Sequence, residues 1–150
     1  MMLEWKESIL LDADIDKVWV LFELENLPKI MPDVVSTIPI EIKEGVVGST
    51  YKQVYREGKR TMEYVVTDLA HEDREDYKYN RSGFSLANLF EIEVAYELEA
   101  VNGKQTRFTY SGQNRGKNIL GKALLLLTPK KQNQKVVDEF MARVKRVAEA

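Results

Sequence analysis

Near its C-terminus the chain repeats apolar residues at steps of three and four, the spacing of one face of an α-helix. The repeat predicts a helix over residues 130–148, whose apolar side chains are Val136, Val137, Phe140, Met141, Val144, Val147 and Ala148. The opposite face is charged and carries Asp138, Arg143, Lys145 and Arg146. We therefore expect this helix to cover a sheet, with Val137, Phe140 and Val144 buried.

A second apolar block precedes that helix. Four successive leucines, residues 124–127, cover most of a helical circumference, which predicts burial on more than one side. Thr128-Pro129 then predicts a break, with Thr128 as the N-cap of the next helix and Pro129 at its first position. The glycine-containing segment 112–121 either turns the chain toward these helices or lets the leucine-rich helix move and admit a ligand.

The N-terminal residues 3–11 alternate in polarity and predict a strand. Asp12 or Asp14 is then expected to cap a short helix, whose core face is formed by Ile15, Val18, Trp19 and Phe22. A second helical turn over residues 25–30 ends before Pro32, because the residue preceding a proline is pushed out of the helical region. Two short helices therefore follow the first strand.

From Val34 onward the period changes to two. The alternation predicts strands near residues 34–43, 49–57, 60–70, 75–82, 88–100 and 104–113, with turn residues between them. With the first strand included, the chain is expected to form seven antiparallel strands.

Two hairpins have a register that can be predicted. Gly58 opens a two-residue turn that pairs Tyr55 with Met62, Gln53 with Tyr64 and Tyr51 with Val66. In the last hairpin, a two-residue turn at Asn102-Gly103 would set apolar residues opposite charged ones. A three-residue loop over residues 101–103 instead pairs Leu98 with Thr106, Tyr96 with Phe108 and Val94 with Tyr110, and leaves Glu97 and Arg107 outside.

Several of these inward positions are polar, and a sealed core would have to satisfy each of them. A cavity that holds water or a ligand would relieve this requirement, although a tyrosine can also bury its ring and leave its hydroxyl at an edge. The candidate cavity-lining residues are Tyr51, Tyr55, Tyr64, Arg81, Tyr96, Phe108, Tyr110, Leu125, Leu126, Asn133 and Phe140. Arg81 could bind a carboxylate if its strand turns it inward. His71 lies in a charged segment and is expected at the surface.

Composition narrows the chemistry. The 150 residues include no cysteine and one histidine, which excludes disulfides and any metal site built from cysteine and histidine, and no cofactor is expected. The length fits a single domain over residues 1–150. The start of the chain does not resemble a signal peptide and no apolar run is long enough to span a membrane, so we expect a cytoplasmic protein.

The charge is unevenly distributed. The formal net charge is −2, but residues 118–150 contain seven Lys/Arg against three Asp/Glu. This basic end is either a solvated helix face or a contact for an anionic membrane or partner, and the acidic balance elsewhere argues against nucleic acid.

The order of elements, together with several short motifs, resembles the START-like or SRPBCC superfamily, whose α+β architecture is called the helix-grip fold. The motifs are residues 18–22, Leu27-Pro28, residues 31–34, Gly45 and residues 47–50, which are similar to the opening of its polyketide cyclase/dehydrase-like branch. The Ala-Pro dipeptide common before the first helix is here Ala13-Asp14. The resemblance implies a curved seven-stranded antiparallel sheet that grips the long C-terminal helix on its concave face, with a largely apolar pocket between them.

Three functions remain open, because proteins of this superfamily include lipid carriers, hormone receptors, aromatic cyclases and quinone-binding proteins. The first is binding or transport of a small apolar or amphipathic molecule, such as a lipid, a quinone or a polyketide-like compound. The second is a polyketide cyclase or dehydratase type of enzyme, although no catalytic motif is visible. The third is a protein-interaction module with a filled core. A cavity of some hundreds of Å³ favours the first two.

Overall fold

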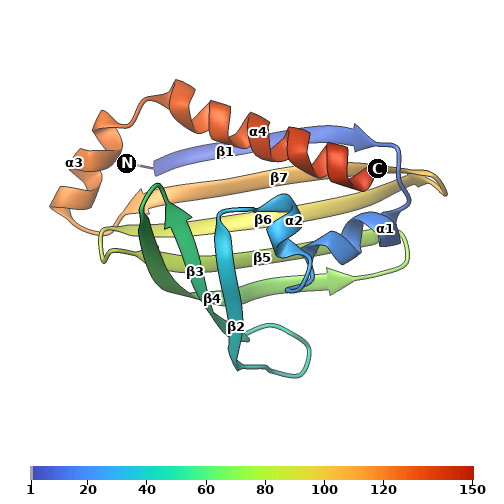
Figure 1. Ribbon diagram of the computed structural model, residues 1–150, viewed down its shortest axis with the longest axis horizontal. Helices are drawn as coiled ribbons and strands as arrows, with labels where there is room; N and C mark the ends of the chain where they lie inside the picture. Colours follow the sequence, from blue (N-terminus) through green and yellow to red (C-terminus); the bar gives the residue numbers. More distant parts are fainter. Residues whose placement is uncertain (1) are drawn as a thin grey trace.

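The structure is a computed structural model that describes residues 2–150, and it forms one seven-stranded antiparallel sheet with helices on one face (Figure 1). The strands are β1 (Met2–Leu11), β2 (Val34–Glu41), β3 (Thr50–Glu57), β4 (Arg60–Asp73), β5 (Tyr77–Leu86), β6 (Phe90–Asn102) and β7 (Gln105–Gly116). Their order in the sheet is β1-β7-β6-β5-β4-β3-β2. The helices are α1 (Ile15–Trp19), the 3₁₀ turn η1 (Val20–Phe22), α2 (Leu27–Ile30), α3 (Ile119–Leu127) and α4 (Lys130–Ala148). The predicted fold class is confirmed.

Helix α4 lies along the sheet and supplies much of the core (Figure 1). Val137, Phe140 and Val144 are buried, as its periodicity predicts. They pack in one cluster with residues of β1, β6, β7 and the short helices, including Leu11, Val18, Ile30, Leu98 and Phe108. Burial of this apolar stripe, more than helix propensity, fixes the position of α4.

The connection from β1 to β2 folds as the sequence indicates. The side chain of Asp14 accepts a hydrogen bond of 2.8 Å from the backbone N–H of Lys17, so Asp14 is the N-cap of α1. The chain then passes through η1 and α2, which ends at Ile30, just before Met31-Pro32. Ile15, Val18 and Ile30 face the core.

The two predicted hairpin registers have different outcomes. The pairs Tyr55–Met62, Gln53–Tyr64 and Tyr51–Val66 are confirmed, and Gly58 has the positive φ of +61° that its turn requires. The register predicted for β6 and β7 is wrong by two residues, since Tyr96 lies opposite Tyr110 and Leu98 opposite Phe108.

The physical reason for the shifted register lies at the tip of that hairpin. Asn102 pairs with Gln105 across a two-residue turn, and its side chain accepts a 2.8 Å hydrogen bond from the N–H of Lys104. A β-bulge at Val101 then adds one residue to β6, so that apolar side chains of β6 and β7 again lie on the same face of the sheet. Because side chains alternate with a period of two, a shift of two residues leaves Tyr96, Phe108 and Tyr110 on the same face, as expected.

The break between the last helices is confirmed, but its details differ. Thr128 ends α3, and its hydroxyl donates to the carbonyl of Leu124 at 3.0 Å instead of capping α4. Pro129 is the residue that precedes α4. The predicted burial of the four leucines on several sides is wrong, because only Leu125 is buried.

The segment between β7 and α3 is short and tightly packed. Strand β7 continues to Gly116, which leaves only two residues before α3. A Cβ atom on Gly121 would overlap the carbonyl oxygen of Leu89, and one on Gly116 would overlap the backbone of Lys122. This close approach of three backbone segments favours a fixed turn of the chain over a moving joint.

Candidate functional site

A cavity of about 710 Å³ lies between the sheet, α4 and the connection from α1 to β2. This volume is within the range of pockets that hold small molecules. Its walls come from the short helices, strands β2 to β7 and α4, and include Trp19, Phe22, Met31, Tyr55, Val66, Ser82 and Phe140. The hypothesis of a filled core is therefore contradicted by the structure.

Aromatic rings from the sheet and from α4 line the cavity. The rings of Tyr64 and Phe84 stack with centroids 4.3 Å apart, and Tyr110 lies 4.7 Å from Phe140. Burial raises the pKa of Tyr64 and Tyr110 to about 12 and raises the pKa of Tyr96 well above its ordinary value. These phenols therefore remain neutral at physiological pH, and the wall offers apolar ring faces with uncharged polar tips.

The polar wall of the cavity centres on Asp68, which is only 7% exposed and lies on β4, the strand that also carries Tyr64. The side-chain N–H of Asn80 donates to Asp68 Oδ1 at 3.2 Å, and Asn80 Oδ1 lies 3.0 Å from His71 Nδ1. Since the carboxylate requires a donor, the amide of Asn80 must direct its oxygen toward His71. Neutral His71 then carries its proton on Nδ1 and keeps Nε2 as an acceptor.

The placement of His71 in this wall corrects the expectation that it lies at the surface. The pairing of β4 with β5 shifts between Asp68 and Ala70, so Leu69 is the extra residue of a β-bulge. A bulge reverses the alternation of inward and outward side chains. Asp68 before the bulge and His71 after it therefore face the same cavity, although they are three positions apart in the sequence.

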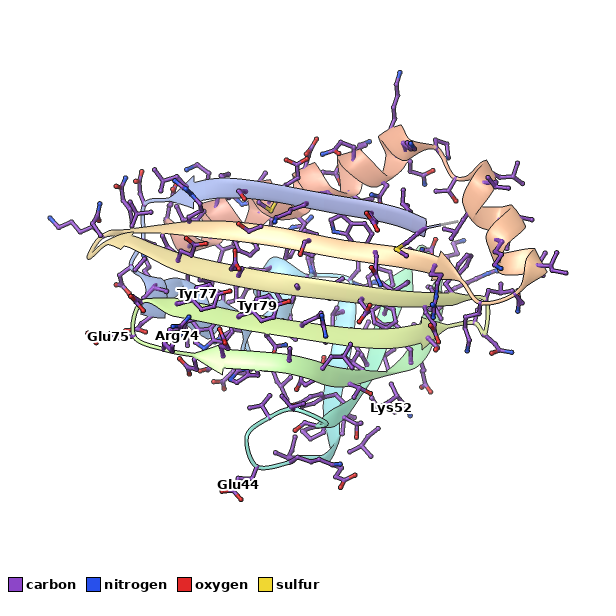
Figure 2. The ribbon with its side chains drawn as sticks, turned by 180° about the vertical axis from the view of Figure 1, so that it is seen from behind. Glu44, Lys52, Arg74, Glu75, Tyr77 and Tyr79 are labelled. Atoms are coloured by element: carbon purple, nitrogen blue, oxygen red, sulfur yellow. The ribbon has the colours of Figure 1, made fainter. Side chains whose placement is uncertain are left out.

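Arg81 is placed outside the cavity, and the suggestion that its strand turns it inward is wrong. On β5, Asn80, Ser82 and Phe84 line the cavity, so the odd-numbered residues point to the other face. Figure 2 looks onto that outer face and shows Tyr77 and Tyr79 of the same odd-numbered set. Arg81 is exposed there, with Nε 3.9 Å from a carboxylate oxygen of Glu93.

A match to a family model decides the chain's relationship to known proteins. Residues 2–149 match the model of the family described as polyketide cyclase/dehydrase and lipid transport. The chain belongs to this family. A search of curated proteins by sequence found no match.

Solved structures of similar fold agree with the membership in the polyketide cyclase/dehydrase and lipid transport family. Ara h 8.0201 is 18% identical, with each chain covered completely and a TM-score of 0.69. Norcoclaurine synthase from Thalictrum flavum, in complex with dopamine and hydroxybenzaldehyde, is 14% identical over 93% of this chain and 84% of its own, with a TM-score of 0.61. The Zhui aromatase/cyclase from Streptomyces sp. R1128 is 10% identical over 100% of this chain and 98% of its own, with a TM-score of 0.70. At these identities the likeness shows the fold alone.

In this member of the family, the structure brings together only part of the residue set suggested by the sequence. Six of the eleven residues line the cavity, namely Tyr51, Tyr55, Tyr64, Tyr96, Tyr110 and Phe140. Phe108 is fully buried in the core next to Phe22. Leu125, Leu126 and Asn133 belong to α3 and the first turn of α4, and none of them is a lining residue. Access past α3 therefore has no support in the arrangement of the cavity walls.

Sequence reasoning missed the polar wall. The candidate cavity-lining residues did not include Asp68, His71, Asn80 or Ser82. An even-numbered set on β4, with Tyr64 and Val66 inward, does predict an inward Asp68. No such signal exists for His71, because the bulge that redirects it is decided by pairing with β5.

Carboxylates dominate the charge around the cavity. Besides Asp68, the lining includes the exposed residues Glu23, Asp33 and Glu139. Arg143 also lines it, and its guanidinium donates to the carbonyl oxygen of Ile30 at 3.2 Å. Within residues 2–150 there is no group of three or more His, Cys, Asp or Glu side chains that could hold a metal ion. The arrangement therefore favours ligands that are neutral or positively charged.

Proposed function

We propose that this protein reversibly binds an amphipathic small molecule. The apolar body of that molecule lies among the aromatic rings, and its hydrogen-bond-donating or cationic group lies at Asp68. The observation that carries this proposal is a buried carboxylate in the wall of a cavity of about 710 Å³. No ion pair joins Asp68 to a lysine or arginine within residues 2–150.

A buried carboxylate is costly unless hydrogen bonds or an opposite charge compensate it. Asn80 supplies one neutral donor at 3.2 Å, and the Tyr51 hydroxyl is a second neighbour of the carboxylate, since burial and the charge of Asp68 raise the pKa of Tyr51. A ligand amine or hydroxyl at this position would add a further donor, and an ammonium group would also interact with the faces of the neighbouring aromatic rings. A ligand carboxylate would instead be repelled by Asp68 and by the acidic residues that line the cavity with it.

The test uses three probes that share one ring system and differ in the head group: naphthylethylamine, naphthylethanol and naphthylacetic acid. Isothermal titration calorimetry at low ionic strength would measure each dissociation constant. We expect the amine to bind at least about tenfold more tightly than the acid, which corresponds to about 1.4 kcal/mol. The alcohol should lie between them.

The variant Asp68→Asn should remove most of this preference and bring amine and acid to within about threefold of each other. Glu99→Gln is the matched control, because it removes the same charge from an exposed position in β6. If the acid binds as tightly as the amine to the unaltered protein, the assigned role of Asp68 is wrong. If none of the probes binds below about 1 mM, reversible binding itself is contradicted.

A second candidate is an enzyme of the cyclase or dehydratase type, and the position of His71 favours it. Its Nε2 is an acceptor in the wall of the cavity, while Asn80 fixes the other ring nitrogen. Such a side chain can take a proton from a bound ligand. Incubation with polyketide-like probes followed by mass spectrometry separates the two functions, because a binding protein returns the probe unchanged and a dehydratase returns it without one water.

A further inference from the structure

Helix α3 exposes an apolar face that the rest of the chain leaves uncovered. Ile119 is 88% exposed, Leu126 67% and Leu127 79%, and Leu120 and Leu124 are also exposed. At about 100° per residue, these five side chains and Ala123 fall within one arc of roughly 160° around the helix. The face is therefore continuous.

The opposite side of α3 holds the helix against the sheet. Gly121 and Leu125 are its buried residues, and they lie outside the exposed arc. The side chain of Asn118 caps the helix through the N–H of Gly121 at 2.9 Å, and its amide donates to the carbonyl of Asn88 at 3.0 Å. The exposed face thus belongs to a firmly anchored helix at one end of the sheet, away from α1 and α2 (Figure 1).

Positive charge surrounds this apolar face. Residues 117–137 contain five lysines and no aspartate or glutamate. Lys122, Lys130 and Lys131 are exposed and take part in no ion pair within residues 2–150. The two remaining lysines of this segment are engaged, since Lys117 donates to Asn88 at 3.1 Å and Lys135 lies 3.9 Å from Glu139.

We propose that α3 docks the protein on an anionic lipid surface, with Ile119, Leu126 and Leu127 inserted at the boundary between headgroups and acyl chains. Aliphatic side chains on one face and lysines around it are the features of helices that lie in this interface. No helix within residues 2–150 is long and apolar enough to cross a membrane, so α3 would lie on the surface. A symmetric contact with a second copy would bring the lysine rims toward one another, whereas anionic headgroups neutralise them.

The experiment is vesicle flotation of the full chain, with vesicles of phosphatidylcholine alone and of phosphatidylcholine containing about one third phosphatidylserine. We expect the protein to float with the anionic vesicles and to bind the neutral ones at least about tenfold more weakly. Raising the salt concentration to about 0.5 M should release most of the bound protein, because charges at the membrane surface are screened over a Debye length. Equal binding to both vesicle types, or binding to neither, overturns the proposal.

Two pairs of variants test the residues. Leu126→Gln/Leu127→Gln should reduce anionic vesicle binding by about tenfold or more. Its control is Ile38→Thr/Ile40→Thr in β2, where the side chains are 57% and 59% exposed. Lys130→Gln/Lys131→Gln should weaken binding by a similar factor, whereas Lys59→Gln/Lys104→Gln, the same change in charge at exposed hairpin turns, should not.

Circular dichroism of each variant checks that it folds. If Leu126→Gln/Leu127→Gln does not fold, Lys130→Gln/Lys131→Gln still tests the proposal. Retention of vesicle binding by both Leu126→Gln/Leu127→Gln and Lys130→Gln/Lys131→Gln contradicts the assignment of α3. Light scattering tests whether the exposed face of α3 instead contacts a second copy of the chain. Membrane docking is overturned if the unaltered protein does not bind vesicles but forms a dimer, and if Leu126→Gln/Leu127→Gln converts that dimer to a monomer.

Discussion

Phe140→Ala is the substitution that tests most directly how α4 is held on the sheet. The Phe140 side chain is buried, and its ring lies 4.7 Å from that of Tyr110, 6.1 Å from Tyr96 and 6.3 Å from Phe108. Truncation of a buried phenylalanine to alanine destabilises a protein by about 3–5 kcal/mol. Because Phe140 also lines the cavity, its ring is not surrounded by protein atoms on every side. We therefore expect a loss of about 3 kcal/mol.

Urea unfolding, followed by the fluorescence of Trp5 and Trp19, would measure this loss. For a chain of this size about 3 kcal/mol corresponds to a decrease in Tm of roughly 6–12 °C. The dependence of the unfolding free energy on urea should stay unchanged, since a change in slope would indicate altered compactness of one of the two states.

Val136→Ala is the control, because Val136 belongs to the same helix but is 60% exposed. Its effect should stay within about 0.5 kcal/mol. A Phe140→Ala variant that unfolds at the same urea concentration as the unaltered protein would show that α4 does not pack through this ring. Equal losses in both variants would show that the face assignment is wrong.

Two further predictions concern the tyrosines and the α3 joint. Burial raises the pKa of Tyr64 and Tyr110 to about 12, against 10.0 for the free side chain, so their contribution to stability is complete below pH 10 and is lost as the pH rises to about 12. The absorbance of tyrosinate should therefore rise at a lower pH in urea than in the folded protein. Titration curves that coincide in the two states would contradict the burial of these rings. Gly121→Ala should destabilise the protein by about 1–3 kcal/mol in urea unfolding, because the new Cβ overlaps the Leu89 carbonyl. The control Gly103→Ala should have little effect, because its Cβ meets no atom within 4 Å. Equal losses of stability in the two variants would show that α3 is not tightly packed at Gly121.

Periodicity predicts the elements of this protein well wherever one face of a strand or helix is buried. The alternation along β3 and β4 fixes the pairs around Gly58, since any shift by one residue would expose Tyr51 and Val66. The stripe of α4 is predicted for the same reason. In these elements the local pattern and the tertiary contacts favour the same arrangement.

Local pattern fails where a contact with a distant segment decides the outcome. The bulge at Leu69 depends on how β4 pairs with β5, and it alone turns His71 toward the cavity. The leucine run in α3 is typical of a buried helix, yet the buried residues of α3 are only Gly121 and Leu125. A sequence can predict that α3 is apolar, but the packing of Gly121 on Leu89 decides which side of it is covered.

The formal net charge of −2 is the sum of two regions of opposite charge, and their separation makes the charge distribution of the protein asymmetric. Carboxylates of Glu23, Asp33 and Glu139 line the cavity, while residues 117–135 around α3 carry five lysines and no acidic residue. An anionic surface would attract the end that carries α3 and repel the acidic residues of the cavity. Exchange of a cationic or neutral ligand with the solvent would then remain open while α3 is bound, because no residue of α3 forms a wall of the cavity.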